Sequence, residues 1–206
     1  MAAPRSVKEM PRPCRIVGVI TTLAELRTAV RMPRPPDLFE LRLDHLVGLE
    51  QELESNIGKA GAPIIITARH PAEGGANNLS LKQRRELIWR FLPCAQYVDV
   101  ELRSARALRP LLQRARETRV QCILSFHHLE LTPSSRSLHA KAVAAKAHGA
   151  DVFKVATRTD TLIQLSRLLN FAANDDAAVP ISAMGIGKFG AISRVLLARN
   201  GLALVG

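Results

Sequence analysis

The 206-residue chain is poor in aromatic residues and cysteines, and it has no long apolar run. Aromatic residues make up 4% of it, which leaves few rings on which single-stranded nucleic acid bases would stack. Its three cysteines, Cys14, Cys94 and Cys122, are far apart and form no CxxC pair, so we expect reduced thiols in a cytoplasmic protein rather than disulfides or a zinc site. No segment has the apolar length of a signal peptide core or a membrane span, so we expect no membrane association.

Positive charge is in excess. Lysine and arginine number 29 against 18 aspartates and glutamates, for a net charge of +11. Such a surplus fits a nucleic acid partner, an anionic small molecule or a basic proteome. The arginines between residues 84 and 119 are scattered along predicted helices rather than gathered in a tail, which favours a solvated basic surface. We therefore expect no nucleic acid partner.

Eight short apolar segments alternate with seven helical patterns. The first 13 residues contain three prolines and four charges and are predicted to form a flexible arm, followed by a single domain over 14–206. Strands are expected at 15–20, 38–43, 63–67, 97–101, 121–126, 151–156, 180–184 and 202–205. Helices are expected at 22–32, 49–59, 80–91, 104–118, 137–148, 161–172 and 191–200.

This alternation predicts an α/β fold. The strands are continuously apolar, as in parallel sheets covered on both faces. Two architectures remain, an open doubly wound sheet and a closed (β/α)8 TIM barrel. The count of eight strands favours the barrel, at the short end of its size range and ending at or just after strand eight.

Lys154 lies in the middle of the apolar segment Ala150–Ala156. A lysine in apolar surroundings loses proton affinity, because desolvation penalises the charged form. We therefore expect a neutral amine that forms a Schiff base with a ketone or aldehyde. The alternative is an edge-strand lysine that faces solvent.

Other polar side chains occupy the carboxyl ends of the predicted strands, where parallel architectures place their chemistry. They are Glu40, Arg42, Asp44, Arg69, Glu73, Glu101, Ser125, His127, His128 and Arg194. Each has a structural alternative: a charged network at the barrel mouth, a core histidine or a helix cap. Their convergence at one end of the strands favours an active site for a small anionic carbonyl compound.

The segment Gly185–Gly190 spells GxGxxG between a strand and a helix. A dinucleotide fingerprint also needs an acidic residue about twenty positions later, and no acidic residue follows Asp176, so we expect no cofactor. These glycines are instead expected to bring backbone N–H groups up to an anionic group. We also expect no metal, because the adjacent His127 and His128 would point in opposite directions on a strand.

Taken together, the motifs resemble those of type I 3-dehydroquinate dehydratases, the Schiff-base lyases of the shikimate pathway. In order they are Glu40-Leu-Arg42-Leu-Asp44, Thr67-Ala-Arg69 with Glu73-Gly-Gly, Ser125-Phe-His127 with Thr132-Pro133, Ala150-Asp-Val-Phe-Lys154-Val-Ala156, and Met184-Gly with Ser193-Arg194. The resemblance runs from about Arg15 to the end of the chain. It implies a (β/α)8 barrel that works without metal or cofactor, usually as a homodimer.

The resemblance also implies roles in converting 3-dehydroquinate to 3-dehydroshikimate. Lys154 would condense with the C3 ketone, and His127 would take the C2 proton and then protonate the leaving C1 hydroxyl. Glu73 would orient His127. Arg194 would hold the substrate carboxylate, and Glu40, Arg42 and Arg69 would bind the rest of the ring.

Two features depart from the family pattern. Members usually continue past strand eight into a loop that contacts the substrate and then a last helix, and His128 stands where they have Asp or Asn. Two other hypotheses therefore stay open: another lysine-imine barrel, such as an aldolase, and a weakly active or inactive barrel that binds an anionic metabolite.

Overall fold

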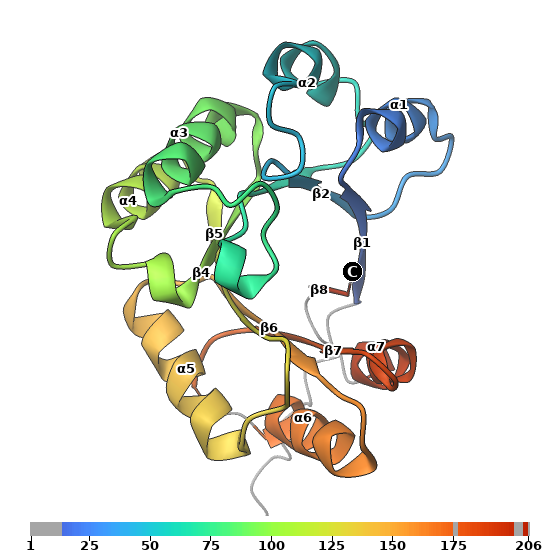
Figure 1. The fold of residues 1–206 in the computed structure, drawn as a ribbon, viewed down its shortest axis with the longest axis vertical. Coiled ribbons are helices and arrows are strands. Elements are labelled where there is room, and N and C mark those ends of the chain that lie inside the picture. Colours follow the sequence, from blue (N-terminus) through green and yellow to red (C-terminus); the bar gives the residue numbers. More distant parts are fainter. Residues whose placement is uncertain (1–13, 175–176, 200–203, 206) are drawn as a thin grey trace, which may run out of the picture.

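The computed structural model describes residues 14–174, 177–199 and 204–205. The strands form one parallel sheet in the order β7-β6-β5-β4-β3-β2-β1-β8. Its two end strands, β7 and β8, lie close together, so the sheet curls into a barrel with the helices around it (Figure 1). The strands are β1 (Arg15–Ile20), β2 (Leu38–Arg42), β3 (Ile64–Thr67), β4 (Tyr97–Glu101), β5 (Gln121–His128), β6 (Val152–Arg158), β7 (Ile181–Ile186) and β8 (Leu204–Val205). The (β/α)8 prediction is confirmed.

A helix follows each strand from β1 to β7. They are α1 (Leu23–Arg31), α2 (Glu50–Ile57), α3 (Leu81–Phe91), α4 (Arg109–Glu117), α5 (Ser135–Ala147), α6 (Leu162–Asn174) and α7 (Gly190–Arg199). Short 3₁₀ turns lie at Pro71–Glu73, Leu92–Cys94 and Leu102–Ser104. Thr22 and Ser80 begin α1 and α3 with capping boxes, in which each hydroxyl accepts a backbone N–H that the helix itself leaves unpaired.

The element boundaries differ from the predicted ones mainly at three places. Helix α4 begins at Arg109 rather than 104, because Pro110 lacks an N–H and fits only the first turn of a helix. Strand β5 extends to His128 and β6 to Arg158, beyond the apolar stretches that marked them. The predicted arm at 1–13 and residues 202–203 of the last predicted strand lie outside the described residues.

The barrel interior is built in layers, since alternate residues of each strand point inward. The lower layer is apolar and consists of Val17, Leu38, Ile65, Tyr97, Ile123 and Val152. Two positions further along their strands come Glu40, Thr67, Asp99, Ser125 and Lys154, which are all buried. The barrel therefore has an apolar floor beneath a charged layer.

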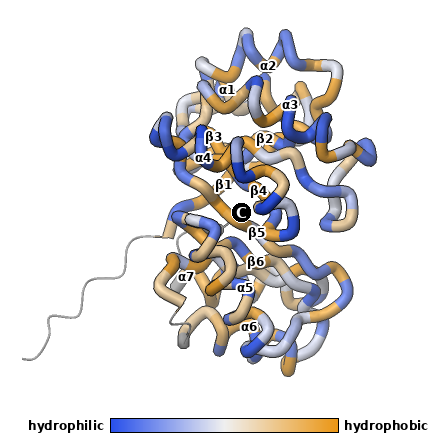
Figure 2. The backbone as a smooth tube through the Cα atoms, turned by 90° about the vertical axis from the view of Figure 1, so that its left-hand side faces the viewer, coloured by the Kyte–Doolittle hydropathy of each residue, from blue (hydrophilic) through white to orange (hydrophobic). Residues whose placement is uncertain are grey.

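The larger core lies outside the strands, between the sheet and the helices. Phe153, Val155, Leu41 and Ile66 are buried there, on the faces opposite the inner side chains. Figure 2 shows hydrophobic colour along the strands and hydrophilic colour on outer turns of α1, α2 and α3. None of the helices in the described ranges is long and apolar enough to cross a membrane.

Candidate active site

A cavity of about 190 Å³ opens at the carboxyl ends of the strands and reaches past the charged layer to Val17 and Ile65 of the apolar layer. It is lined by Val17, Val19, Glu40, Arg42, Ile65, Arg69, Glu73, His127, Lys154, Ala156, Met184, Ile186 and Arg194. The structure thus brings all seven predicted site residues, Lys154, His127, Glu73, Glu40, Arg42, Arg69 and Arg194, into one cavity.

Lys154 rises from the middle of β6 and is only 7% exposed. Its Nζ donates to Glu40 Oε2 at 2.9 Å and to Asp99 Oδ2 at 3.0 Å. Two carboxylates on different strands therefore hold the amine at the base of the cavity.

The expectation that apolar surroundings make Lys154 a neutral amine is wrong. Burial disfavours its ammonium, but the charges of Glu40 and Asp99 outweigh burial and raise the pKa of Lys154 above its usual value. The apolar neighbours in sequence, Phe153 and Val155, lie in the outer core, because alternate residues of a strand face opposite sides. Lys154 instead faces the acidic residues of β2 and β4.

Asp99 is a site residue that sequence reasoning missed. It is fully buried in the middle of β4, where it contacts Lys154, Arg69 and Ser125. A signal was present, since a charged residue in the apolar strand Tyr97–Glu101 is as unusual as Lys154 in β6. Burial favours its neutral form, but Arg69 and Lys154 outweigh burial and keep the pKa of Asp99 below its usual range.

Arg69, at the end of β3, links the acidic groups to one another. Its Nη2 donates to Asp99 Oδ2 at 2.9 Å and lies 3.4 Å from Glu40 Oε1, and its Nη1 donates to Ser125 Oγ at 2.6 Å. Nη1 is also 3.4 Å from Nδ1 of His127. Burial opposes its charge, but Asp99 and Glu40 outweigh burial and raise the pKa of Arg69.

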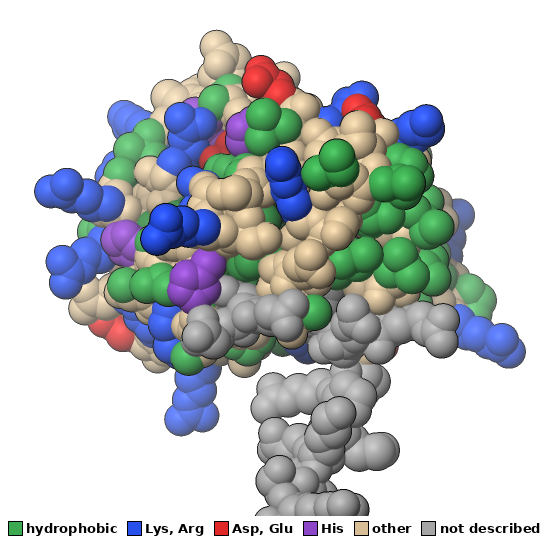
Figure 3. Space-filling view, turned by 90° about the horizontal axis from the view of Figure 1, so that it is seen from below, with side chains coloured by type: hydrophobic (Ala, Val, Ile, Leu, Met, Phe, Trp, Pro, Cys, Tyr) green, Lys and Arg blue, Asp and Glu red, His purple; other side chains and the backbone are tan. Residues whose placement is uncertain are grey.

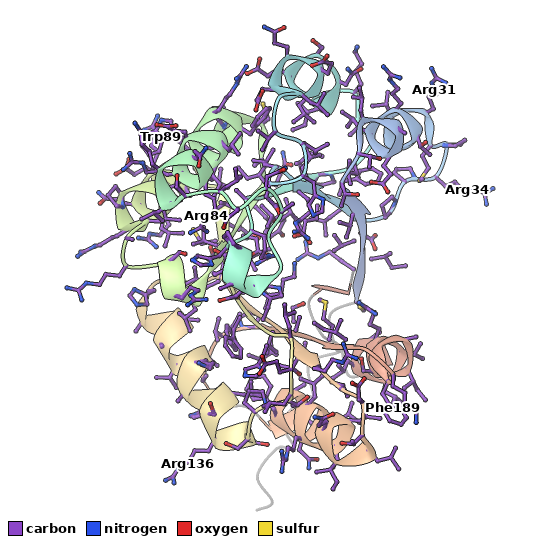
Figure 4. The ribbon with its side chains drawn as sticks, viewed as in Figure 1. Arg31, Arg34, Arg84, Trp89, Arg136 and Phe189 are labelled. Carbon is purple, nitrogen blue, oxygen red and sulfur yellow. The ribbon has the colours of Figure 1, made fainter. Side chains whose placement is uncertain are left out.

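Glu101 extends this network outward to α3. It accepts the backbone N–H of His70 at 2.8 Å and pairs with Arg84 at 2.8 Å. Arg84 is 2% exposed and lies between α3 and the strands, whereas Arg31, Arg34 and Arg136 extend outward (Figure 4). Arg84 also donates to Ser104 Oγ at 3.1 Å, so this second arginine supports the cavity wall from behind.

Glu73 and His127 form the closest histidine–carboxylate pair in the cavity. Glu73 Oε2 lies 3.0 Å from His127 Nδ1 and also accepts the backbone N–H of His127 at 3.0 Å. Burial raises the pKa of Glu73 to about 7, against the opposing effect of that N–H. Burial and the charge of Arg69 lower the pKa of His127 well below its usual value, so His127 is neutral at pH 7.

The loop after β3 needs its glycines to bring Glu73 to this position. A Cβ at Gly75 would lie 2.1 Å from the carbonyl oxygen of Arg69, so only glycine permits the close return of the chain. The backbone N–H of Gly75 donates to the carbonyl of His70 at 3.0 Å and closes the turn.

Arg42 and Asp44 compensate each other at the cavity rim. Arg42 donates through Nε at 3.0 Å and through Nη2 at 2.8 Å to the two oxygens of Asp44. Asp44 also accepts the backbone N–H groups of Arg69 and Ala76. The predicted Glu40–Arg42–Asp44 cluster thus divides: Arg42 pairs with Asp44, and Glu40 faces Lys154.

Arg194 enters the cavity from the first turns of α7. Ser193 Oγ accepts the N–H of Gly185 at 2.8 Å and donates to the carbonyl of Gly190 at 2.6 Å, which ties the start of α7 to β7. The Nε of Arg194 is buried without a hydrogen-bond partner among the described residues. Arg194 therefore has donor capacity left for an anionic ligand.

The anionic group that meets the glycine loop Gly185–Gly190 is the carboxylate of Asp160. Asp160 Oδ1 accepts the N–H of Lys188 at 2.7 Å. The N–H groups of Phe189 and Gly190 donate to backbone carbonyls. The expectation that an anionic group meets these N–H groups therefore holds for Lys188, which binds Asp160, and not for Phe189 and Gly190.

The cavity thus combines a buried lysine, a neutral histidine held by a carboxylate, and an arginine with a free donor. A lysine that condenses with a ketone and a base that removes a proton next to the imine carry out β-elimination. In the part of the chain that the structure describes, no group of three or more His, Cys, Asp or Glu residues is placed to hold a metal ion.

Comparison with known proteins gives one consistent result. The family model for type I 3-dehydroquinase matches residues 14–204. A 3-dehydroquinate dehydratase of Shouchella clausii is 34% identical over 184 residues, which cover 83% of this chain and 72% of the relative. The crystal structure of 3-dehydroquinate dehydratase from Geobacillus kaustophilus aligns with a TM-score of 0.84 at 27% identity, over 94% of this chain and 81% of that one.

An aldolase shows a more distant likeness. Deoxyribose phosphate aldolase from Aeropyrum pernix aligns with a TM-score of 0.58 at 16% identity, over 92% of this chain and 82% of that one, and shares the fold alone. The family match, by contrast, extends over the whole described barrel and includes every predicted site residue. The chain belongs to the type I 3-dehydroquinase family.

Proposed function

We propose that this chain dehydrates 3-dehydroquinate to 3-dehydroshikimate, a lyase reaction of the shikimate pathway, through a Schiff base on Lys154. The observation that carries the proposal is that Lys154 and the Glu73–His127 pair line the same cavity. Lysine supplies the electron sink, and the histidine supplies the proton transfers that elimination of water requires.

Lys154 attacks the C3 ketone and forms an imine with loss of water. The protonated imine withdraws electrons from C2 and makes its proton acidic. The carboxylates of Glu40 and Asp99 lie within 3.0 Å of the lysine nitrogen and favour its positive charge.

His127 removes the C2 proton and returns a proton to the C1 hydroxyl as it leaves. Its Nδ1 faces Glu73 at 3.0 Å, which leaves Nε2 for the substrate. An ionised Glu73 accepts Nδ1–H, and this tautomer places the lone pair of Nε2 toward the proton to be removed.

The substrate carboxylate binds Arg194, whose guanidinium has an unpartnered donor. Arg42 borders the ring, with its own orientation set by Asp44. Glu40 contacts the substrate ring at the base of the cavity, beside Lys154. Arg69 positions Glu40 and His127, because its nitrogens lie 3.4 Å from both side chains.

An aldolase-like lyase would share Lys154 without needing the Glu73–His127 pair, and an inactive barrel would need neither Lys154 nor that pair.

An activity assay separates the dehydratase from both alternatives: 3-dehydroquinate is added and the absorbance of the conjugated enone product is followed. We expect turnover by the wild type and a loss of at least about a hundredfold in His127→Ala, the usual contribution of a general acid–base. Absence of product from folded wild-type protein would refute the proposed activity.

We further propose that the enzyme is a cytoplasmic homodimer. Cysteines Cys14, Cys94 and Cys122 are free thiols, which supports a reducing compartment.

The homodimer is proposed from an exposed apolar surface on α6 and α7. Four of its hydrophobic side chains are more than half exposed: Leu162, Ile163, Ile192 and Val195. Hydrophobic side chains gather on the half of the lower face where these helices lie (Figure 3), as expected of a surface that a second subunit covers. Sedimentation equilibrium tests the dimer: a monomer mass would refute it.

A further inference from the structure

We infer that Asp99 is the fixed counter-ion of Lys154, a positioning residue that keeps the lysine nitrogen cationic both as the ammonium and as the iminium. This inference rests on the proposed function for the iminium stage only. The inference is argued from the hydrogen bonds that the Asp99 carboxylate accepts.

The carboxylate of Asp99 is saturated with donors. Oδ1 accepts from Ser125 Oγ at 2.5 Å and from Arg69 Nη1 at 3.2 Å. Oδ2 accepts from Arg69 Nη2 at 2.9 Å and from Lys154 Nζ at 3.0 Å. A carboxylate offers about four lone-pair positions, and these four donors occupy them. Asp99 therefore cannot take up a proton without losing one of these bonds.

Glu40 differs from Asp99 in its surroundings. It lines the cavity, whereas Asp99 does not. Its Oε2 accepts from Lys154 Nζ at 2.9 Å, and its Oε1 accepts from Thr67 Oγ1 at 2.8 Å, with Arg69 more distant at 3.4 Å. Of the two carboxylates on Lys154, Glu40 has room for a proton.

The charged and titratable groups around the lysine nitrogen come from several elements of the barrel. They are Glu40 from β2, Arg69 from β3, Asp99 from β4 and His127 from β5, with Arg194 from α7 across the cavity. Among them Arg69 is positive, His127 is neutral, and Glu40 and Asp99 are negative.

Imine formation then proceeds with its charges balanced. Lys154 passes one proton to Glu40 Oε2, and the neutral amine forms a C–N bond with the ketone carbon as the C=O π bond breaks. A proton moves from nitrogen to oxygen to give the carbinolamine. Glu40 returns its proton to the carbinolamine hydroxyl, which leaves as water, and the product is an iminium whose single positive charge faces Asp99.

A carboxylate fixed at this point has a direct consequence for the elimination. Only a protonated imine is a strong electron sink, and a buried iminium without a counter-ion loses its proton. Asp99 therefore acts through Lys154 and does not contact the substrate.

The test measures the charge of the Lys154 amine without 3-dehydroquinate. Wild type, Asp99→Asn and Ser125→Ala are treated with formaldehyde and cyanoborohydride at pH 7.5, which methylates neutral amines. The rate at Lys154 is read by peptide mass spectrometry relative to the exposed Lys82, whose side chain is 76% accessible. We expect Asp99→Asn to react at least about tenfold faster, one unit of pKa. Ser125→Ala keeps the carboxylate and should react within about twofold of the wild type.

A second readout separates this inference from the proposed function. With 3-dehydroquinate, Asp99→Asn should still give a borohydride-trapped adduct while kcat falls. If the wild type forms no such adduct, the proposed function fails, but the methylation ratio still tests the counter-ion. An unchanged methylation rate in folded Asp99→Asn would overturn the inference.

Asp99→Asn leaves a buried cation short of its partner, so its folding is checked by circular dichroism. If it does not fold, the double variant Asp99→Asn, Lys154→Met replaces it, because removing both charges restores neutrality. We expect the double variant to fold where Asp99→Asn does not, as judged by circular dichroism. A double variant that also fails to fold would overturn the inference.

Discussion

One oxygen of Glu73 holds His127 twice, at the ring and at the backbone. Oε2 lies 3.0 Å from Nδ1 and 3.0 Å from the backbone nitrogen of the same residue. The histidine is thereby fixed in position and orientation. The protonation of one carboxylate decides which ring nitrogen carries the hydrogen.

This relationship predicts the pH dependence of turnover. Burial raises the pKa of Glu73 to about 7. Below that pH the protonated carboxyl donates to Nδ1, and Nε2 then carries a hydrogen and cannot take a substrate proton. Above it the carboxylate accepts Nδ1–H and frees Nε2. We expect kcat/KM, which reports the ionisation of the free enzyme, to rise with pH through about 7 and to level off above.

Glu73→Gln tests the assignment, because glutamine cannot ionise. The variant should have a lower kcat/KM that no longer changes near pH 7, as measured by the enone absorbance across pH 5.5 to 9. If the rise stays at the same pH in Glu73→Gln, another group is responsible for it.

Arg194 is predicted to bind the substrate carboxylate through its Nε, a donor without a partner among the described residues. Arg194→Gln should raise KM by about 10- to 100-fold, since a hydrogen bond to a charged group contributes roughly 1.5–3 kcal/mol. Arg167→Gln on the exposed side of α6 is the matched control and should leave KM unchanged. Equal KM values for both variants would rule out the role of Arg194.

The buried Arg84–Glu101 pair is predicted to stabilise the wall behind the cavity. Both side chains are at most 2% exposed, and Arg84→Met removes the shorter ion pair of the buried Glu101, which keeps only Arg69 at 3.5 Å as an ionic partner. The variant should therefore lose up to about 3–5 kcal/mol in the free energy of unfolding. Arg90 and Glu54 pair at 2.7 Å on the surface, and Arg90→Met should change stability little. Urea unfolding of both variants measures the difference, and similar losses would show that burial does not set the cost.

The barrel was readable from the sequence because its strands are mostly apolar and because several of its helices begin with side-chain caps. Thr22 and Ser80, for example, mark the starts of α1 and α3 within one residue. The start of α4 was misplaced, because a 3₁₀ turn at Leu102–Ser104 and a further turn at 105–108 precede the helix, which begins at Arg109. Local composition does not distinguish such a turn from the first turn of a helix.

The part of the site that consists of polar side chains at strand ends was predictable from the sequence. Lys154, His127 and Arg194 stand out against apolar or glycine-rich neighbours. Asp99 lies in mid-strand, away from the strand ends, and its partners come from three other strands. The charge of Lys154 depends on those partners across the barrel, so its neighbours in sequence, Phe153 and Val155, gave the wrong environment.

The central claim is that Lys154 forms an imine with 3-dehydroquinate. The measurement is the intact mass of the protein after incubation with 3-dehydroquinate and borohydride, for the wild type and for Lys154→Ala. We predict a ligand-sized adduct on the wild type, mapped to Lys154, and none on the variant. An unmodified wild type at high ligand concentration, or equal adducts on both proteins, would contradict the Schiff-base mechanism for this chain.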